Sequence, residues 1–375
     1  MSRLKDLHKF GQSPWYDNIE RDFLLSGGLK SMIDEDGIAG VTSNPSIFEK
    51  AINGSAAYDA EIAKLTREGK DVQAIYDELT TWDVSKAADI LHEVYQSSKG
   101  LDGFVSIEVS PHLAHDAANT VKDAKRLAER IGKDNLMIKV PATKEGIRAI
   151  QQLTVEGINV NATLIFSQGC YSAVARAYIL GITERLEKGL PVDGIHSVAS
   201  FFVSRIDTYV DTILDELAAN DKKKNKTEWM KTLRGKAAVA QSKVAYNLFR
   251  KLFYGPEFKK LENAGANVQR LLFGSTSTKN PAYSDVKYVE EIIGEGTINT
   301  IPHVTIEAFR DHGQAKDSLG KELEGAKDVL TSLRECGISM ADVCQQIQAD
   351  GVEAFIKAYD KLIASLEEKR KLIIS

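Results

Sequence analysis

The chain has 375 residues, 43% of them apolar and 27% charged, which is the composition of a globular protein large enough to bury a sizeable core. Its formal net charge of −5 argues against a general nucleic-acid-binding protein. No apolar run approaches the roughly 20 residues of a membrane span, and the first ten residues lack the apolar segment of a signal peptide. The three cysteines, Cys170, Cys336 and Cys344, form no CxxC pair, which indicates reduced thiols in a cytoplasmic protein.

Short apolar runs bounded by polar residues or glycine predict seven strands, and a weaker candidate before them supplies the eighth strand that a closed barrel needs. The first, around residues 14–18, has the weakest pattern. The other seven lie at 37–43, 103–109, 135–142, 158–166, 196–204, 269–277 and 297–303. Amphipathic stretches such as 115–132 and 144–157 separate them, and Gly132 and Gly157 are typical helix stop signals. Alternating strands and helices indicate a parallel sheet, and eight strands predict an α/β fold of the (β/α)8 TIM-barrel type with additional helices.

The chain contains no obvious linker or repeat, so we expect a single domain over residues 1–375, with a C-terminal helix at about 351–372. The lysine-rich run 220–226 is interpreted as a solvated loop between two helices. A doubly wound sheet remains open from the pattern alone, although no glycine-rich phosphate turn follows the first strand.

Motifs for nucleotides, zinc peptidases and serine hydrolases are absent from the sequence, because it contains no GxxxxGK[ST], GxGxxG, HExxH or GxSxG. One metal-binding alternative remains. His112 and His115 form a His-x-x-His pair close to Glu108, and such a pair beside carboxylates can hold a metal ion. Two ordinary histidines at a loop and a helix start explain the same pattern, and we expect no metal.

Lys139 is the residue that most needs an explanation. It lies among Leu136, Met137, Ile138 and Val140 in a predicted buried strand, where an ammonium group is costly to desolvate. A lysine held in a poorly solvated barrel interior gives up its proton more readily, and the free amine can attack a carbonyl carbon. A lysine at a strand end that reaches solvent or a carboxylate fits the local sequence equally well.

Polar residues interrupt or follow several other predicted strands. These residues are Asn44, Glu108, Asn161, Thr163 and Ser200. Each alone is more often a satisfied polar group of the core. Together they match the way in which barrel enzymes collect catalytic groups from the C-terminal ends of several strands.

Long motifs of the chain are similar to those of a known family. They are GVTSNPSIF (40–48), VSIEVSPHLAHD (105–116), MIKVPATKEGIRAI (137–150), EGINVNATLIFS (156–167), SFFVSR (200–205) and GSTSTKN (274–280). In this order they resemble the transaldolases, specifically their longer bacterial subgroup. The resemblance runs from about Gln12 to the C-terminus, and its two central motifs are long and specific.

The resemblance implies a role for each polar residue. Lys139 matches the Schiff-base lysine on the fourth barrel strand, and Asp17 matches the general acid/base of carbon–carbon cleavage. Glu108 and Thr163 match the pair that orients a water for imine formation and hydrolysis. The remaining matches bind substrate: they are Asn44, Asn161 and Ser200 for the dihydroxyacetone unit, Arg205 and Lys279 for phosphate, and Phe202 as an aromatic wall.

Two of these positions are informative in detail. Lys279 stands where many relatives have a second arginine, which keeps the charge but loses the planar two-pronged grip. Phe202 matches a position that is Phe in transaldolases and Tyr in the aldolase branch of the superfamily.

The resemblance therefore implies a cofactor-free enzyme of the non-oxidative pentose phosphate pathway. It would move a dihydroxyacetone unit from sedoheptulose 7-phosphate or fructose 6-phosphate to glyceraldehyde 3-phosphate or erythrose 4-phosphate. Expected partners are small sugar phosphates, with no nucleic acid and no membrane, in a monomer or homodimer. Three alternatives stay open: a fructose-6-phosphate aldolase that releases free dihydroxyacetone, a metal-dependent aldolase using the histidines, and a catalytically silent sugar-phosphate-binding barrel.

Overall fold

Eight parallel strands form a closed barrel at the centre of the computed structural model, which describes residues 2–221 and 226–374. Each strand pairs with the next along the chain, and β8 closes the barrel against β1. The strands are β1 Gln12–Tyr16, β2 Gly40–Thr42, β3 Phe104–Glu108, β4 Leu136–Pro141, β5 Val160–Ile165, β6 Ser197–Phe202, β7 Arg270–Gly274 and β8 Thr297–Ile301. The predicted TIM barrel is thus confirmed, including its weakest strand, which begins two residues before the predicted range.

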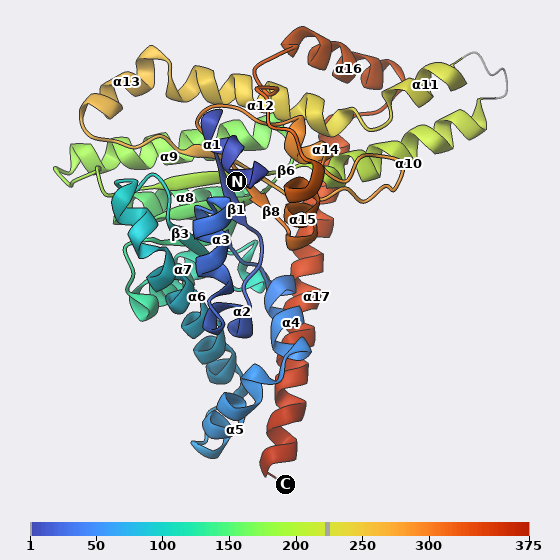
Figure 1. The fold of residues 1–375 in the computed structure, drawn as a ribbon. Helices are drawn as coiled ribbons and strands as arrows, with labels where there is room; N and C mark the ends of the chain where they lie inside the picture. The colour runs from blue at the N-terminus through green and yellow to red at the C-terminus, as the bar shows by residue number, and fades with distance from the viewer. Residues whose placement is uncertain (1, 222–225, 375) are drawn as a thin grey trace.

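Helices surround the barrel (Figure 1). The α-helices are α1 Asp6–Lys9, α2 Arg21–Leu25, α3 Gly28–Asp36, α4 Pro45–Gly54, α5 Asp59–Arg67, α6 Val72–Ser97, α7 Ala117–Ile131, α8 Lys144–Glu156, α9 Gln168–Glu187, α10 Ser204–Asn220, α11 Thr227–Leu233, α12 Ala237–Phe253, α13 Pro256–Asn263, α14 Lys287–Glu290, α15 His303–His312, α16 Leu323–Glu335 and α17 Met340–Ile374. Short 3-10 helices are η1 Arg3–Lys5, η2 Ala56–Tyr58 and η3 Pro111–Leu113. Among the described residues, no helix is long and apolar enough to cross a membrane.

The helices at 115–132 and 144–157 are confirmed as α7 and α8, and Gly132 and Gly157 end them in the left-handed conformation. The lysine-rich run 220–226 falls between α10 and α11 in the chain, but its residues 222–225 lie outside the described residues, so its interpretation as a solvated loop stays a prediction.

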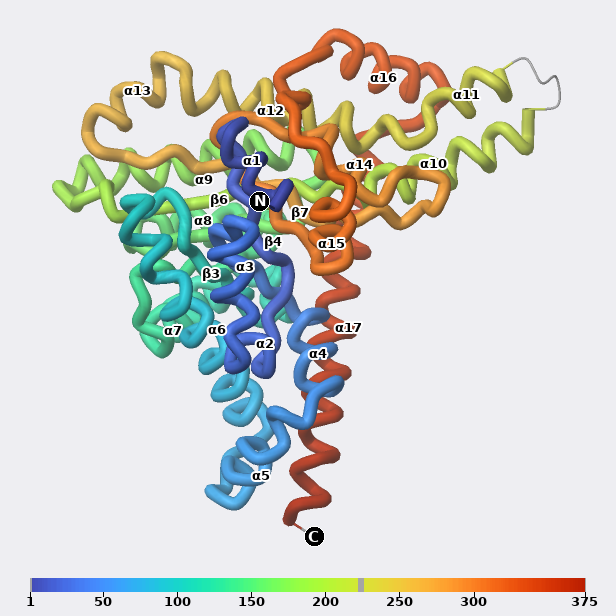
Figure 2. The backbone as a smooth tube through the Cα atoms, in the orientation of Figure 1, coloured from blue at the N-terminus to red at the C-terminus, as the bar shows by residue number. Residues whose placement is uncertain are grey.

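The C-terminal helix is much longer than predicted. The expected range, 351–372, begins at Gly351, whereas α17 begins at Met340. Glycine usually marks a helix boundary, but Gly351 lies in the middle of α17 and is buried against the barrel. Figure 2 shows the consequence: α17 passes the barrel and continues beside α4 to the end of the molecule that also carries α5, and it packs on both helices.

Candidate active site

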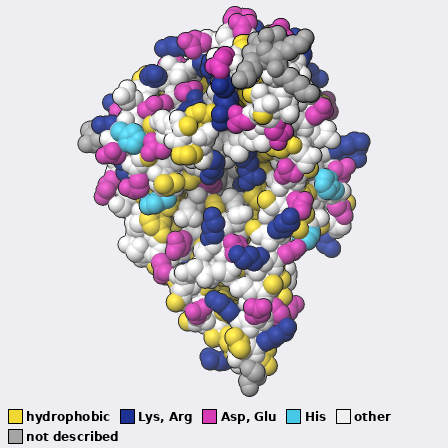
Figure 3. Space-filling view, turned by 90° about the vertical axis from the view of Figure 1, so that its right-hand side faces the viewer, with side chains coloured by type: hydrophobic (Ala, Val, Ile, Leu, Met, Phe, Trp, Pro, Cys, Tyr) yellow, Lys and Arg dark blue, Asp and Glu magenta, His cyan; other side chains and the backbone are white. Residues whose placement is uncertain are grey.

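A cavity of about 140 Å³ opens where the barrel strands end. Seven of the ten predicted site residues line this cavity: Asp17, Asn44, Lys139, Ser200, Phe202, Arg205 and Lys279. The other three, Glu108, Asn161 and Thr163, are buried on β3 and β5, the two strands that flank β4. The face of the molecule that carries α10, α15 and α17 is hollowed near its middle, and lysine and arginine side chains gather around the hollow (Figure 3).

Lys139 lies within β4 and is buried, so it is not a strand-end lysine that reaches solvent. Its side chain is 5% exposed, and Nζ donates a 2.9 Å hydrogen bond to the carbonyl of Ser43. In the barrel register Lys139 stands opposite Glu108 on β3 and Asn161 on β5. The only carboxylate that pairs with it in the described part of the chain is Glu108, whose Oε2 lies 3.8 Å from Nζ.

Glu108 and Thr163 lie on either side of the Lys139 strand. Both oxygens of Glu108 and the hydroxyl of Thr163 are buried and lack a hydrogen-bond partner among the described residues. Burial raises the pKa of Glu108 to about 7, and the nearby Lys139 only partly opposes this increase. A carboxyl group with a pKa near neutrality can both take and return a proton.

Asp17 directly follows β1, and two threonines support it. The hydroxyl of Thr42 donates a 2.8 Å hydrogen bond to Asp17 Oδ1 and lies 2.6 Å from the hydroxyl of Thr300. Burial raises the pKa of the Asp17 carboxyl, while Lys139, Thr42, Lys279 and Arg205 oppose the increase. Thr42 and Thr300 were not predicted as site residues, although both lie near the ends of predicted strands, the same signal that identified Asn161 and Ser200.

Asn44, Asn161 and Ser200 were expected to bind the dihydroxyacetone unit, but only Asn44 and Ser200 line the cavity. Asn161 uses both ends of its amide on protein: Nδ2 donates to Ser106 Oγ (3.0 Å) and Oδ1 accepts from Ser200 Oγ (2.6 Å). Ser200 lines the cavity above this pair. Asn44 also lines the cavity, and its Oδ1 accepts the 3.0 Å N-cap hydrogen bond of α4 from the Ile47 amide.

Arg205 and Lys279 provide positive charge at the cavity wall. Arg205 lies in the first turn of α10, where the helix dipole also favours an anion. Lys279 Nζ donates a 2.6 Å hydrogen bond to Ser277 Oγ. Neither side chain forms an ion pair within the ranges that the structure describes. Burial, followed by the charges of Arg205 and Lys50, lowers the pKa of Lys279, and burial lowers the pKa of Arg205. Two desolvated cations that form no ion pair with a described carboxylate suit a bound phosphate.

Phe202 forms an apolar wall of the same cavity. The Arg205 guanidinium lies 5.9 Å from its ring centroid, and Phe166 contacts its ring edge-to-face at 5.4 Å. Phe355 of α17 lines the cavity as well. No sequence signal linked Phe355 to the site, because its position follows only from where α17 packs.

The histidines of the metal alternative have separate partners. His112 Nε2 lies 2.6 Å from Asp360 Oδ1 on α17, whereas His115 Nδ1 lies 3.5 Å from Glu145 Oε2 on α8. Both histidine side chains are largely exposed. Within residues 2–221 and 226–374, no group of three or more His, Cys, Asp or Glu residues is arranged to hold a metal ion.

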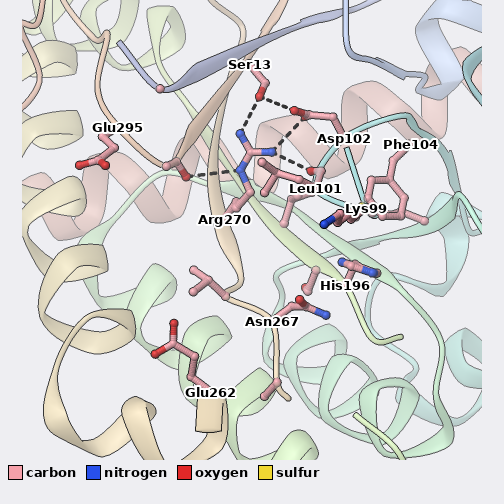
Figure 4. A pocket seen from close by; sticks show the side chains of 18 of the residues that line it. Ser13, Lys99, Leu101, Asp102, Phe104, His196, Glu262, Asn267, Arg270 and Glu295 are labelled. Carbon is pink, nitrogen blue, oxygen red and sulfur yellow. Dashed lines mark hydrogen bonds and ion pairs between the residues drawn. The ribbon is translucent and has the colours of Figure 1, made fainter. Parts of the chain in front are cut away.

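A larger cavity of about 740 Å³ lies at the opposite end of the barrel (Figure 4). Arg270 is the central charged group there. Its guanidinium donates to Ser13 Oγ, Asp102 Oδ1 and the carbonyls of Leu101 and Thr297. Those donors are occupied by the protein, so this end of the barrel has the character of a structural network.

The fold and the site together define a (β/α)8-barrel enzyme that presents a buried lysine, flanked by carboxylates, beside an anion-binding wall. The profile of the Transaldolase/Fructose-6-phosphate aldolase family matches residues 14–366. The chain is 45% identical to a transaldolase of Trichodesmium erythraeum over 372 residues, which cover 99% of this chain and 98% of the relative. It is 42% identical to "Transaldolase 2" of Nostoc punctiforme (99% and 98% covered) and 43% identical to a transaldolase of Thiobacillus denitrificans (98% and 100% covered). The chain therefore belongs to the transaldolase/fructose-6-phosphate aldolase family, and its similarity over the full length is to transaldolases.

Proposed function

We propose that the protein is a transaldolase of the non-oxidative pentose phosphate pathway, in which Lys139 forms a Schiff base with a ketose phosphate. The observation that carries this proposal is the buried Lys139 amine in the barrel cavity, 3.8 Å from a carboxylate whose pKa is about 7. The donor would be sedoheptulose 7-phosphate or fructose 6-phosphate, and the acceptor glyceraldehyde 3-phosphate or erythrose 4-phosphate.

In the first half-reaction, Lys139 Nζ attacks the keto carbon of the donor. The resulting carbinolamine loses water, and an iminium ion forms. Glu108 and Thr163 support this step, because their buried polar atoms make no hydrogen bond to described protein groups and can engage the departing water. The Glu108 carboxyl can pass the proton, since its pKa lies near neutrality.

Carbon–carbon cleavage follows. Asp17 takes the proton of the hydroxyl on C4, the bond between C3 and C4 breaks, and its electron pair moves to the iminium nitrogen. The product aldose phosphate leaves, and a neutral enamine stays on Lys139. Thr42 supports this role of Asp17 through its 2.8 Å hydrogen bond. In the second half-reaction the enamine attacks the acceptor aldehyde, which receives the proton from Asp17, and water then releases the new ketose.

Substrate binding is divided between two walls of the cavity. Arg205 and Lys279 are proposed to hold the phosphate that both donor and acceptor carry. Asn44 and Ser200 are proposed to bind the hydroxyls of the dihydroxyacetone unit. Asn161 would act mainly through Ser200, because both ends of its amide are already bonded to protein.

We also propose that the chain works as one catalytic domain in the cytoplasm, as a monomer or homodimer. Support for one domain comes from the family profile, which spans residues 14–366, and from α17, which packs against α4, α5, α6 and α10. The three free cysteines fit a reducing compartment.

The test is a coupled assay with fructose 6-phosphate, run with and without erythrose 4-phosphate. A transaldolase forms sedoheptulose 7-phosphate with the acceptor and releases little dihydroxyacetone without it. Phe202→Tyr should increase this release at the expense of transfer, because a phenol can hold a water or pass a proton to the enamine and a phenyl ring cannot. Release by the wild type that is as fast as transfer would identify a fructose-6-phosphate aldolase, and inactivity with both sugars would favour a silent binding barrel.

A further inference from the structure

Strand β5 contains a bulge immediately after Thr163. Between the pairs Ala162–Ala199 and Ile165–Phe201, β5 advances by three residues and β6 by two, so β5 holds one extra residue. Leu164 accommodates it with a φ of +59°, a left-handed conformation that is strained for leucine. Leu164 is fully buried. A strained residue of this kind persists only where its surroundings hold it.

Helix α17 provides these surroundings. Gln348 Nε2 donates to the carbonyl of Leu164 at 2.8 Å and to the carbonyl of Ala142, just after β4, at 3.1 Å. One turn further along, Gly351 faces the Leu164 side chain: a Cβ on Gly351 would lie only 3.0 Å from Leu164 Cδ2. Helix α17 therefore fits the bulge in two ways. Gln348 supplies a hydrogen bond to its backbone, and Gly351, which has no side chain, leaves room for the Leu164 side chain.

The two carbonyls that accept from Gln348 belong to residues next to Thr163. The Ala142 amide donates a 2.8 Å hydrogen bond to the carbonyl of Thr163, and Gln348 donates to the carbonyls of Ala142 and of Leu164, the residue that follows Thr163. Ala142 follows the strand that carries Lys139, and Leu164 follows Thr163. Lys139 and Thr163 lie on the neighbouring strands β4 and β5, and the Gln348 amide of the C-terminal helix bonds to the backbone at the ends of both strands.

We infer that Gln348 is a positioning residue, which fixes the β5 bulge and thereby holds the Thr163 hydroxyl in place for the water of imine formation and hydrolysis. The inference rests on the proposed Schiff-base function. It gives the long C-terminal helix a role in the reaction, although Gln348 itself touches neither the substrate nor Lys139.

The test uses Gln348→Met, which keeps the length of the side chain and removes its donor. The control is Gln345→Met on the same helix, because Gln345 is exposed and its side chain makes no hydrogen bond in the described structure. The rate of imine formation is measured by mixing each enzyme with fructose 6-phosphate and quenching with borohydride at successive times. Gln348→Met should slow adduct formation by roughly tenfold to a hundredfold, with the KM for erythrose 4-phosphate unchanged. Gln345→Met should match the wild type, and Gln348→Lys, which keeps a donor, should recover much of the rate.

A general structural role is separated from positioning by a double-mutant cycle with Thr163→Ala. If Gln348 acts through Thr163, adding Gln348→Met to Thr163→Ala should change the rate by less than about twofold. A wild-type rate for Gln348→Met, or a full additional loss in the Thr163→Ala background, overturns the inference. Absence of any adduct on the wild type would instead refute the proposed function. Positioning is then judged from a crystal structure of Gln348→Met, where a relaxed Leu164 supports it and an unchanged bulge contradicts it.

Discussion

Glu108 is the residue whose environment predicts a pH dependence. Its pKa is about 7, so it is mostly protonated below neutrality and ionised above it. If the carboxylate acts as the base in imine chemistry, kcat/KM for fructose 6-phosphate should fall about tenfold per pH unit below about pH 7. Glu108→Gln should be slow at every pH and lack this acid limb. Rate measurements between about pH 5.5 and 8.5 test the assignment. If kcat/KM of Glu108→Gln still falls below about pH 7, another group is responsible for the pH dependence.

Arg205 and Lys279 predict the affinity for phosphate. Arg205→Ala should raise the KM for fructose 6-phosphate by roughly tenfold to a hundredfold, the loss of about 1.5–3 kcal/mol expected for a charged hydrogen bond. Lys279→Ala should have a smaller effect, because its single ammonium lacks the two-pronged geometry. Unphosphorylated fructose is the control, since its KM should not respond to either change. An unchanged KM for the phosphate ester in Arg205→Ala would reject the assignment.

The sequence was sufficient to predict most residues of the candidate site, but not their contacts. Lys139, Glu108, Asn161, Thr163 and Ser200 were recognised as polar residues in apolar strands, and the structure brings them to one end of the barrel. Their hydrogen-bond partners could not be predicted from the sequence, because contacts across the barrel join residues far apart in the chain. The Thr42–Thr300 contact joins β2 to β8, and the use of both ends of the Asn161 amide on protein became visible only in the structure.

At the scale of elements, Asn44 serves a helix and a cavity at once. It caps α4 and also lines the active-site cavity. Asn44→Ala should lower the free energy of unfolding by about 1 kcal/mol and raise the KM for fructose 6-phosphate. The matched control is Asp116→Ala, because Asp116 caps α7 through the Asn119 amide and does not line the cavity. Chemical denaturation and steady-state kinetics should show a similar stability loss for both and a KM effect for Asn44→Ala alone. Equal KM values would remove Asn44 from the substrate site.

The strands were easier to predict from the sequence than the limits of the C-terminal helix. Strands of a barrel are buried on both faces, so continuous apolar runs identified seven of them, and the eighth, β1, was proposed from its place in the chain. The weak pattern of β1 reflects Pro14 within the strand and the polar residues Gln12 and Ser13, whose side chains bond inside the barrel base. Gly351 misled the prediction of α17, because its role is close packing against Leu164 and not helix termination.

At the scale of the whole molecule, the two ends of the barrel have separate tasks. The end of the barrel opposite the Lys139 cavity is closed by Arg270, which links β7 to Ser13 of β1, to Asp102 before β3 and to the backbone of β8 (Figure 4). Arg270→Met should lower the free energy of unfolding by about 3–5 kcal/mol, because it leaves the buried Asp102 carboxylate unpaired. Arg250→Met is the control, since its pair with Glu295 is largely exposed and should contribute less than about 1 kcal/mol. If urea unfolding showed similar losses of unfolding free energy for Arg270→Met and Arg250→Met, Arg270 would not have this structural role.

The most direct test of the central claim is borohydride reduction in the presence of fructose 6-phosphate, followed by peptide mass mapping. We expect a three-carbon adduct on Lys139, because cleavage leaves the dihydroxyacetone unit bound there as an imine or enamine until an acceptor arrives. Lys139→Arg keeps the positive charge but offers no nucleophilic amine, so it should carry no adduct and show no transfer. An adduct on a different lysine, or a wild-type enzyme that transfers the three-carbon unit without any adduct, would contradict the account.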